Sequence, residues 1–303
     1  MHIREKNVTF AAKLNSIMMN KQYQELKVEE GTFIPQPVMD YPQENPYERT
    51  LFPKQIKHIE FDEHYPYLDD SWTYRFNLLW GYYIVIHIFL RLKTRIQMGL
   101  RIRGREVLKK YKKELANGAI TICNHVYRLD CPCVLLAVKG VHTTRVPMFA
   151  PNFRTKDGFF MRLAGGVPIP DSTTNMTALK KFNEAFDEFN RRGWWMHIFP
   201  EACRWDFYKP LRPFQKGAFT MSYKYNKPIL PCVITYRERK GIFRLFGKKE
   251  MPLLTITIGE PIFPDTTQPR KTEVERLREV AHNQMTKMAG ITHNPWPVAW
   301  GNQ

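Results

Sequence analysis

Two residues in the middle of the chain, His125 and Asp130, have the types and spacing that general-base catalysis requires. An aspartate five residues after a histidine can fold back across one turn, so that its carboxylate binds one ring nitrogen and fixes the tautomer. The other ring nitrogen can then take a proton from a substrate hydroxyl. The pair lies between an apolar run at 119–123 and a helix-like run at Cys133–Val138, so we expect His125 at the end of a strand.

The spacing alone is weak evidence, because His64 and Asp69 have the same spacing. That second segment lies in a proline-rich region and contains Pro66, whereas Asn124 immediately precedes His125. We therefore interpret the segment at His64 as a surface coincidence without a catalytic role.

Two further segments accompany the first histidine and aspartate: Phe199–Arg204, which reads Phe-Pro-Glu-Ala-Cys-Arg, and Pro228–Val233, which reads Pro-Ile-Leu-Pro-Cys-Val. With these segments, the chain resembles the lysophosphatidate (1-acylglycerol-3-phosphate) acyltransferase family of the glycerol-phosphate acyltransferase superfamily. The first block of that family is Asn-His-x-x-x-x-Asp, the third is Phe-Pro-Glu-Gly-Thr-Arg, and the fourth is a short Pro-x-x-Pro strand. The resemblance extends over roughly residues 99–265.

The resemblance implies direct acyl transfer to the hydroxyl of a lysophospholipid, with acyl-CoA or acyl-carrier protein as the donor and no bound cofactor. Carried over by position, His125 is the base and Asp130 is its partner. The resemblance also implies that Asn124, Glu201 and Arg204 belong to the substrate-binding site, where a guanidinium can hold a phosphate with two hydrogen bonds.

The second block of the family, Gly-x-x-Phe-Ile-Asp-Arg, aligns best with residues 166–172, which places Ser172 at the position of the family's phosphate-contacting arginine. This departure leaves two alternatives. Either another cation contacts the phosphate, for which the candidates are Arg162, Lys216 and Arg154, or the acceptor carries no phosphate at that point.

Ala202 and Cys203 replace the Gly-Thr of the third block. Because alanine tolerates positive φ poorly, we predict that this loop takes a different path from that of the family. Cys131 and Cys203 also lie beside the proposed catalytic groups, and an acyl-cysteine intermediate is the alternative to direct transfer. A nucleophilic thiol needs a lowered pKa, which a sequence does not show.

The arrangement of apolar runs predicts an α/β fold, with a mixed, mostly parallel sheet flanked by helices. Helical periodicity is clearest from Met176 to Arg192, where Gly193 follows as a stop signal, and again from Lys271 to Met288. We expect strands at 119–123, 146–150, 194–199, 228–235 and 253–258.

We divide the chain into a proline-rich extension at 1–73, a membrane-associated helical segment at 74–98 and a catalytic domain at 99–303. The run Phe76–Leu90 is apolar on nearly every helical face but shorter than the ~20 residues of a membrane span. Ten basic residues and one acid follow between Arg91 and Lys113, which favours monotopic attachment to an anionic lipid surface. The alternative is a buried helix followed by a solvated basic face. The resemblance implies a helical hairpin that dips into one leaflet.

Hydrophobic residues make up 43% of the chain, which is enough for a packed core and argues against disorder. The five cysteines form no Cys-x-x-Cys pair, so we expect no zinc. Their odd number, without a secretory signal, suits reduced thiols, and we expect the protein at the cytoplasmic face of the cell membrane.

The net charge of +17 fits lipid, nucleic acid or an acidic substrate. We expect no nucleic-acid partner, because the basic cluster follows an apolar run and is not interleaved with stacking aromatics. Two alternatives to lysophosphatidate acylation remain: an acyltransferase for a non-phosphate lyso-lipid or an amine, and a non-catalytic protein that binds anionic surfaces.

Overall fold

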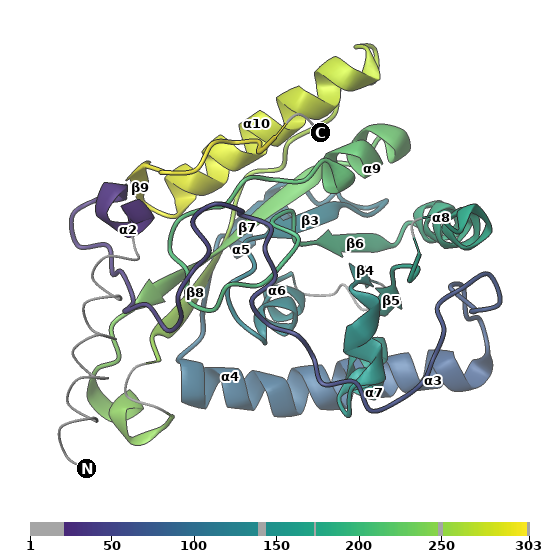
Figure 1. Ribbon diagram of the computed structural model, residues 1–303, viewed down its shortest axis with the longest axis horizontal. Helices are drawn as coiled ribbons and strands as arrows, with labels where there is room; N and C mark the ends of the chain where they lie inside the picture. Colours follow the sequence, from purple (N-terminus) through teal and green to yellow (C-terminus); the bar gives the residue numbers. More distant parts are fainter. Residues whose placement is uncertain (1–20, 139–143, 173, 248–250, 302–303) are drawn as a thin grey trace.

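A computed structural model describes residues 21–138, 144–172, 174–247 and 251–301 (Figure 1). Its helices are α2 (Lys21–Glu25), α3 (Trp72–Trp80), η1 (Gly81–Leu90), α4 (Arg91–Met98), α5 (Arg105–Lys110), α6 (Asp130–Ala137), η2 (Ala150–Arg154), α7 (Gly158–Leu163), α8 (Met176–Arg191), α9 (Gly217–Tyr225), η3 (Gly241–Leu245) and α10 (Arg270–Met288). Its strands are β1 (Lys27–Val28), β2 (Arg101–Arg103), β3 (Ile120–Cys123), β4 (Thr144–Met148), β5 (Gly166–Pro168), β6 (Trp195–Ile198), β7 (Ile229–Arg237), β8 (Leu253–Ile258) and β9 (Ile291–His293).

Seven strands form one sheet in the order β2-β8-β7-β3-β6-β4-β5. Every neighbouring pair is parallel except β7 and β8, which run antiparallel, so the predicted mixed and mostly parallel sheet is confirmed. Each of the five expected apolar runs overlaps a strand. The edge strands β2 and β5 were not predicted, because three residues are too few to show a periodic pattern.

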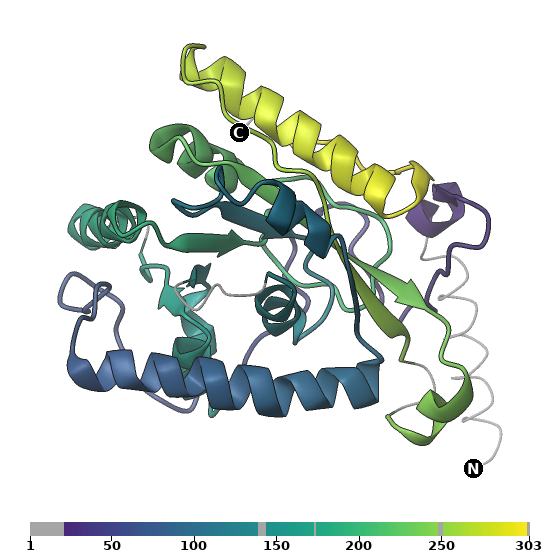
Figure 2. The same ribbon diagram turned by 180° about the vertical axis from the view of Figure 1, so that it is seen from behind.

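Helices cover both faces of the sheet, with α8, α9 and α10 on one face and α6 on the other (Figures 1 and 2). Successive residues of the central strand β3 point to opposite faces, so Ile122 packs in the cluster that contains Phe186 and Leu277, whereas Cys123 packs with Val134. This central strand leads directly to His125, so the most buried part of the core supports the predicted catalytic loop.

A single helix runs without interruption from Trp72 to Met98 through α3, the π-helical η1 and α4, and packs alongside α6 and α7 (Figure 2). The hairpin expected within residues 74–98 is therefore not formed there. A hairpin needs a chain reversal, but Gly81 has helical dihedral angles, with φ −60 and ψ −42. A Cβ atom at this glycine would lie 2.6 Å from the Cβ of Leu163, so the glycine permits close packing of the helix on α7. Among the described residues, no helix is both long and apolar enough to cross a membrane.

Residues 41–71, which we call the strap, run along the main domain before this helix begins. The Tyr41 hydroxyl donates to the carbonyl oxygen of Asp206 at 2.6 Å, and Asp70 pairs with Arg192 through two contacts of 2.6 Å. The strap therefore contacts loops that follow strands β4, β5 and β6, at the edge of the sheet where sites of α/β proteins form.

Candidate active site

His125 and Asp130 contact one another directly, as the sequence predicted. His125 follows the end of β3 and Asp130 begins α6, and the chain between them curls so that His125 Nδ1 lies 2.6 Å from Asp130 Oδ2. The aspartate side chain is 2% exposed and the histidine side chain is 23% exposed. In the part of the chain that the structure describes, His125 Nε2 has no hydrogen-bond partner and so can accept a proton from a ligand.

Backbone groups fix the orientation of the Asp130 carboxylate. Its Oδ2 accepts hydrogen bonds from the backbone N–H groups of Val126 at 3.1 Å and Tyr127 at 3.3 Å, and its Oδ1 accepts from that of Cys131 at 2.8 Å. These three donors hold the carboxylate in one position, so the histidine ring is also held in one orientation.

The ring of Phe199 fixes the plane of the imidazole. It stacks on His125 with a centroid separation of 4.0 Å and an angle of 17° between the planes. On the same phenyl ring, His197 packs edge-on at 4.5 Å. His197 is fully buried, and burial lowers its pKa to about 4, so this second histidine is neutral near pH 7.

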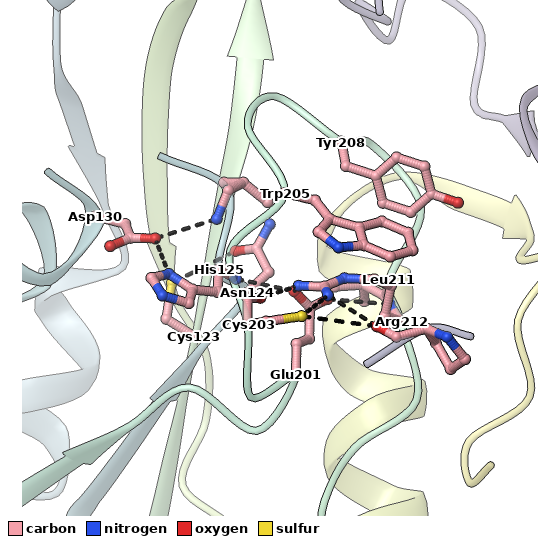
Figure 3. A network of polar contacts seen from close by, with 12 residues as sticks. Cys123, Asn124, His125, Asp130, Glu201, Cys203, Trp205, Tyr208, Leu211 and Arg212 are labelled. Carbon is pink, nitrogen blue, oxygen red and sulfur yellow. Dashed lines mark hydrogen bonds and ion pairs between the residues drawn. The ribbon is translucent and has the colours of Figure 1, made fainter. Parts of the chain in front are cut away.

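A buried ion pair supports the backbone of the catalytic histidine (Figure 3). Glu201 accepts the His125 backbone N–H at 2.9 Å and the Arg212 Nη2 donor at 2.9 Å, both at Oε2. Its Oε1 accepts the Arg212 backbone N–H at 3.0 Å. Both side chains are 1% exposed, so this carboxylate is directed to protein donors, whereas a contact with the acceptor was expected.

Arg212 is a residue that the sequence analysis missed. Burial is the largest single influence and opposes the charge of its guanidinium, but the interactions with Glu201 and Cys203 together outweigh it, so the pKa of Arg212 is raised. One signal was available: an acid such as Glu201 is rarely buried without a cationic partner, and Arg212 lies only eleven residues further along the chain.

Asn124 also has a structural role. Its Nδ2 donates to the Ile234 carbonyl oxygen at 3.0 Å, and its Oδ1 accepts the Ile234 backbone N–H at 2.8 Å. The buried side chain therefore connects the end of β3 to β7, and both ends of the amide that was expected at the substrate-binding site are occupied by protein partners.

Each of the four cations expected to contact a phosphate has a carboxylate partner. Ser172, at the position of the family arginine, is exposed and its hydroxyl lies 2.7 Å from that of Thr174. Arg204 Nε lies 2.8 Å from Asp206 Oδ1 as an ion pair, although the two atoms are not aligned as a hydrogen bond. The other pairs are Arg154 with Asp171, Arg162 with Asp69 at 2.9 Å, and Lys216 with Glu275 at 3.0 Å.

Residues 99–235 match the family model described as Acyltransferase. This segment of the chain is similar to acyltransferases. This range includes every residue of the histidine site described above, and the protein is an acyltransferase enzyme. A comparison with curated proteins finds no match.

Among solved structures, the chain is similar to the crystal structure of the 1-acyl-sn-glycerophosphate (LPA) acyltransferase, PlsC, from Thermotoga maritima. The identity is 18% and the TM-score is 0.46, over 73% of this chain and 84% of that chain.

The loop after β6 adopts the left-handed conformation at Ala202, although alanine was expected to disfavour it. Ala202 has φ 64, a value that favours glycine, and the strain is tolerated because the flanking residues are fixed. The Trp205 backbone N–H donates to the His125 carbonyl oxygen at 3.0 Å, and the Phe207 N–H donates to that of Val126 at 2.8 Å. The loop is thus anchored along the catalytic turn.

Neither cysteine of the acyltransferase site is placed as a nucleophile. Cys131 is buried, and desolvation raises the pKa of its thiol, with a smaller contribution from Asp130. Cys203 is 1% exposed and its sulfur accepts Arg212 Nη1 at 2.9 Å. The geometry therefore favours His125 as the group that acts on the substrate, without an acyl-cysteine intermediate.

Proposed function

We propose that this acyltransferase transfers a fatty acyl group from an acyl thioester, either acyl-CoA or acyl-carrier protein, to the hydroxyl of a lysophospholipid. The acceptor is 1-acylglycerol-3-phosphate, which places the reaction in phospholipid biosynthesis. The observation that carries the proposal is the 2.6 Å contact between His125 Nδ1 and Asp130 Oδ2, inside the domain that matches the acyltransferase family.

In the proposed reaction, His125 Nε2 takes the proton of the acceptor hydroxyl while the hydroxyl oxygen attacks the thioester carbonyl carbon. Asp130 holds the Nδ1–H tautomer and stabilises the imidazolium that forms. The carbon–sulfur bond then breaks, and the departing thiolate takes the proton from the imidazolium. A new ester and a free thiol result, and the histidine returns to its neutral state without a covalent enzyme intermediate.

The test uses the purified full chain with anionic vesicles that contain 1-acylglycerol-3-phosphate and a labelled acyl thioester, in separate reactions with each carrier. We expect His125→Ala to lower turnover by about 10²- to 10⁴-fold, because general-base catalysis contributes that much. The exposed His64 provides the matched control, and His64→Ala should retain wild-type turnover. Retention of turnover by His125→Ala would disprove the proposed mechanism.

One observation favours a second acceptor class. Ser172 supplies no cation, and the four candidate cations are all engaged by carboxylates. A lyso-lipid without a phosphate, or an amine-bearing lipid, would fit such a site. A panel of acceptors with matched acyl chains, with and without the phosphate, separates the two classes, since a strong preference for the phosphate-free acceptor would replace lysophosphatidate.

The helix from Trp72 to Met98 supports a further proposal, that the enzyme attaches to the cytoplasmic face of the cell membrane as a peripheral or monotopic protein. Large apolar side chains are exposed along the helix, and the tip at Ile242, Leu245 and Phe246 lies beside its end at α4. Exposed basic residues follow on the same helix, which suits an interfacial helix on anionic lipid. The exposed apolar residues are Trp72, Phe76, Leu79, Trp80, Tyr83, Ile88, Phe89, Leu92 and Ile96.

Vesicle co-sedimentation tests the attachment. The double substitution Phe89→Glu/Leu92→Glu should weaken binding to anionic vesicles by at least tenfold, because it introduces two acids where apolar side chains are exposed. Met176→Glu is the matched control, since Met176 is an exposed apolar residue at the start of α8. Equal binding of the double variant and the control would exclude this face of the helix as the contact surface.

A further inference from the structure

The strap brings one arginine, Arg49, close to the catalytic loop. The carbonyl oxygen of the preceding residue, Glu48, accepts the indole N–H of Trp205 at 2.9 Å and lies 3.3 Å from the sulfur of Cys203. The Trp205 backbone N–H in turn donates to the His125 carbonyl oxygen at 3.0 Å. The backbone at Arg49 is therefore connected to the catalytic histidine through a single residue.

The side chain of Arg49 extends toward the neighbouring strand end. Its guanidinium lies over the ring of Phe149, with Cζ 3.7 Å from the ring centroid. Phe149 directly follows Met148, the last residue of β4, and β4 lies in the sheet between β6 and β5. The backbone N–H of Ile169, which follows β5, donates to the Met148 carbonyl oxygen at 2.8 Å. Arg49 thus lies between the loop of the third block and the segment that leads to Ser172.

The guanidinium of Arg49 differs from the other candidate cations in its pairing. Within the described ranges, no carboxylate lies at ion-pair distance from it. Its guanidinium stacks on Phe149 and interacts electrostatically with Cys203. Partial burial lowers the pKa of Arg49, because desolvation disfavours the charged form. A partly desolvated cation without a carboxylate partner is suited to bind an anion from solution, and its planar fork matches a phosphate.

We propose that Arg49 binds the phosphate of the acceptor, so that the strap supplies the cation that the segment at Ser172 lacks. This inference rests on the proposed acyl transfer to a lysophospholipid and names the residue that selects a phosphate-bearing acceptor. Phe149 positions the guanidinium by stacking, and the hydrogen bonds of Glu48 fix the backbone from which it extends.

The experiment compares 1-acylglycerol-3-phosphate with the monoacylglycerol of the same chain as acceptors for the full-length enzyme. We expect Arg49→Gln to raise KM for the phosphate-bearing acceptor by about ten- to hundredfold, as the loss of a charged hydrogen bond would, with little change in kcat. KM for the monoacylglycerol should not change, and Arg49→Lys should give an intermediate effect because it keeps the charge without the fork. Lys54→Gln is the matched control, an exposed cation on the same strap.

Three outcomes would overturn the inference. The first is an equal rise in KM for both acceptors, which would mean that Arg49 only holds the strap in place. The second is an unchanged KM for both. The third is a rise in KM for the phosphate-bearing acceptor alone in Arg128→Gln but not in Arg49→Gln. Arg128 is the comparison because its side chain is 64% exposed, although it lies 3.7 Å from the carboxylate of Asp157. If the proposed function itself is wrong, the unmodified enzyme will acylate neither acceptor, which distinguishes that failure from the three outcomes above.

Discussion

Two segments of this protein share the spacing His-x-x-x-x-Asp, but only one of them forms a histidine–aspartate pair. His125 contacts Asp130 at 2.6 Å. His64 is 83% exposed and its closest carboxylate is that of Glu63 at 3.7 Å, while Asp69 pairs with an arginine of α7. The spacing therefore permits the pair without producing it, and the surroundings of each segment decide the outcome.

The two segments differ in their long-range support. Residues far along the chain hold both the ring and the backbone of His125, namely Phe199 by stacking, Glu201 at the N–H and Trp205 at the carbonyl. The segment at His64 belongs to the strap and contains Pro66, which lacks the N–H needed to curl the chain around a carboxylate. A catalytic pair thus needs a turn that several other elements fix in place.

The largest expected difference between the segments concerns their aspartates. Asp130→Asn should lower acyl transfer by about 10²- to 10⁴-fold, because an amide no longer stabilises the imidazolium or selects the Nδ1–H tautomer. Asp69→Asn removes only a partly exposed ion pair and should leave turnover within about twofold. Steady-state rates of the two variants under identical conditions test this comparison, and equal losses would show that the shared spacing itself matters.

The next difference concerns the ion pair that contacts each segment. Arg212→Leu leaves Glu201 buried without a cation and should lower the free energy of unfolding by about 3–5 kcal/mol. Arg162→Leu breaks the pair with Asp69. Because the side chains of Arg162 and Asp69 are 32% and 22% exposed, this change should lower the free energy of unfolding by about 1 kcal/mol or less. Denaturant unfolding at neutral pH measures both. Similar losses in the two variants would contradict the support assigned to Arg212.

The strands and the catalytic turn could be predicted because their signals are local. Apolar runs identified β3, β4, β6, β7 and β8, and helical periodicity identified α8 and α10 to within about a residue. The turn at His125 was recognised from a short block in which the hydrogen bonds of the Asp130 carboxylate all lie within six residues.

The remaining features depend on contacts between residues far apart in sequence. The partners of Arg154, Arg162 and Lys216 come from other elements, and the Pro46 carbonyl that accepts from Arg212 is 166 residues away from it. Neither the buried role of Glu201 nor the course of the strap gives a periodic signal. A hairpin was expected at 74–98 from the family resemblance, and apolar composition alone does not reveal whether the chain reverses there.

A third histidine, His197, makes the stability of the protein depend on pH. Its pKa falls from 6.5 unfolded to about 4 in the folded protein, so between these values the unfolded state binds more protons and stability decreases as the pH falls. The native protein should lose roughly 1–2 kcal/mol between pH 7 and pH 5 from this group. Between pH 7 and pH 5, the free energy of unfolding should fall less steeply in His197→Gln than in His64→Gln. Parallel slopes would show that His197 does not titrate in this way.

The smallest effect concerns the loop that supports the catalytic turn. Ala202 adopts φ 64, where a side chain is strained, so Ala202→Gly should raise the free energy of unfolding by about 0.5–1 kcal/mol even though glycine gains freedom in the unfolded chain. Asn226 has φ 48, a conformation that asparagine tolerates, and Asn226→Gly should change stability by only a few tenths of a kcal/mol. Turnover should stay at the wild-type level in Ala202→Gly, because the backbone that meets His125 keeps its path. A loss of stability in that variant would mean that the strain at Ala202 is relieved elsewhere, and the support of the catalytic turn would then depend on the alanine methyl group and not on the backbone.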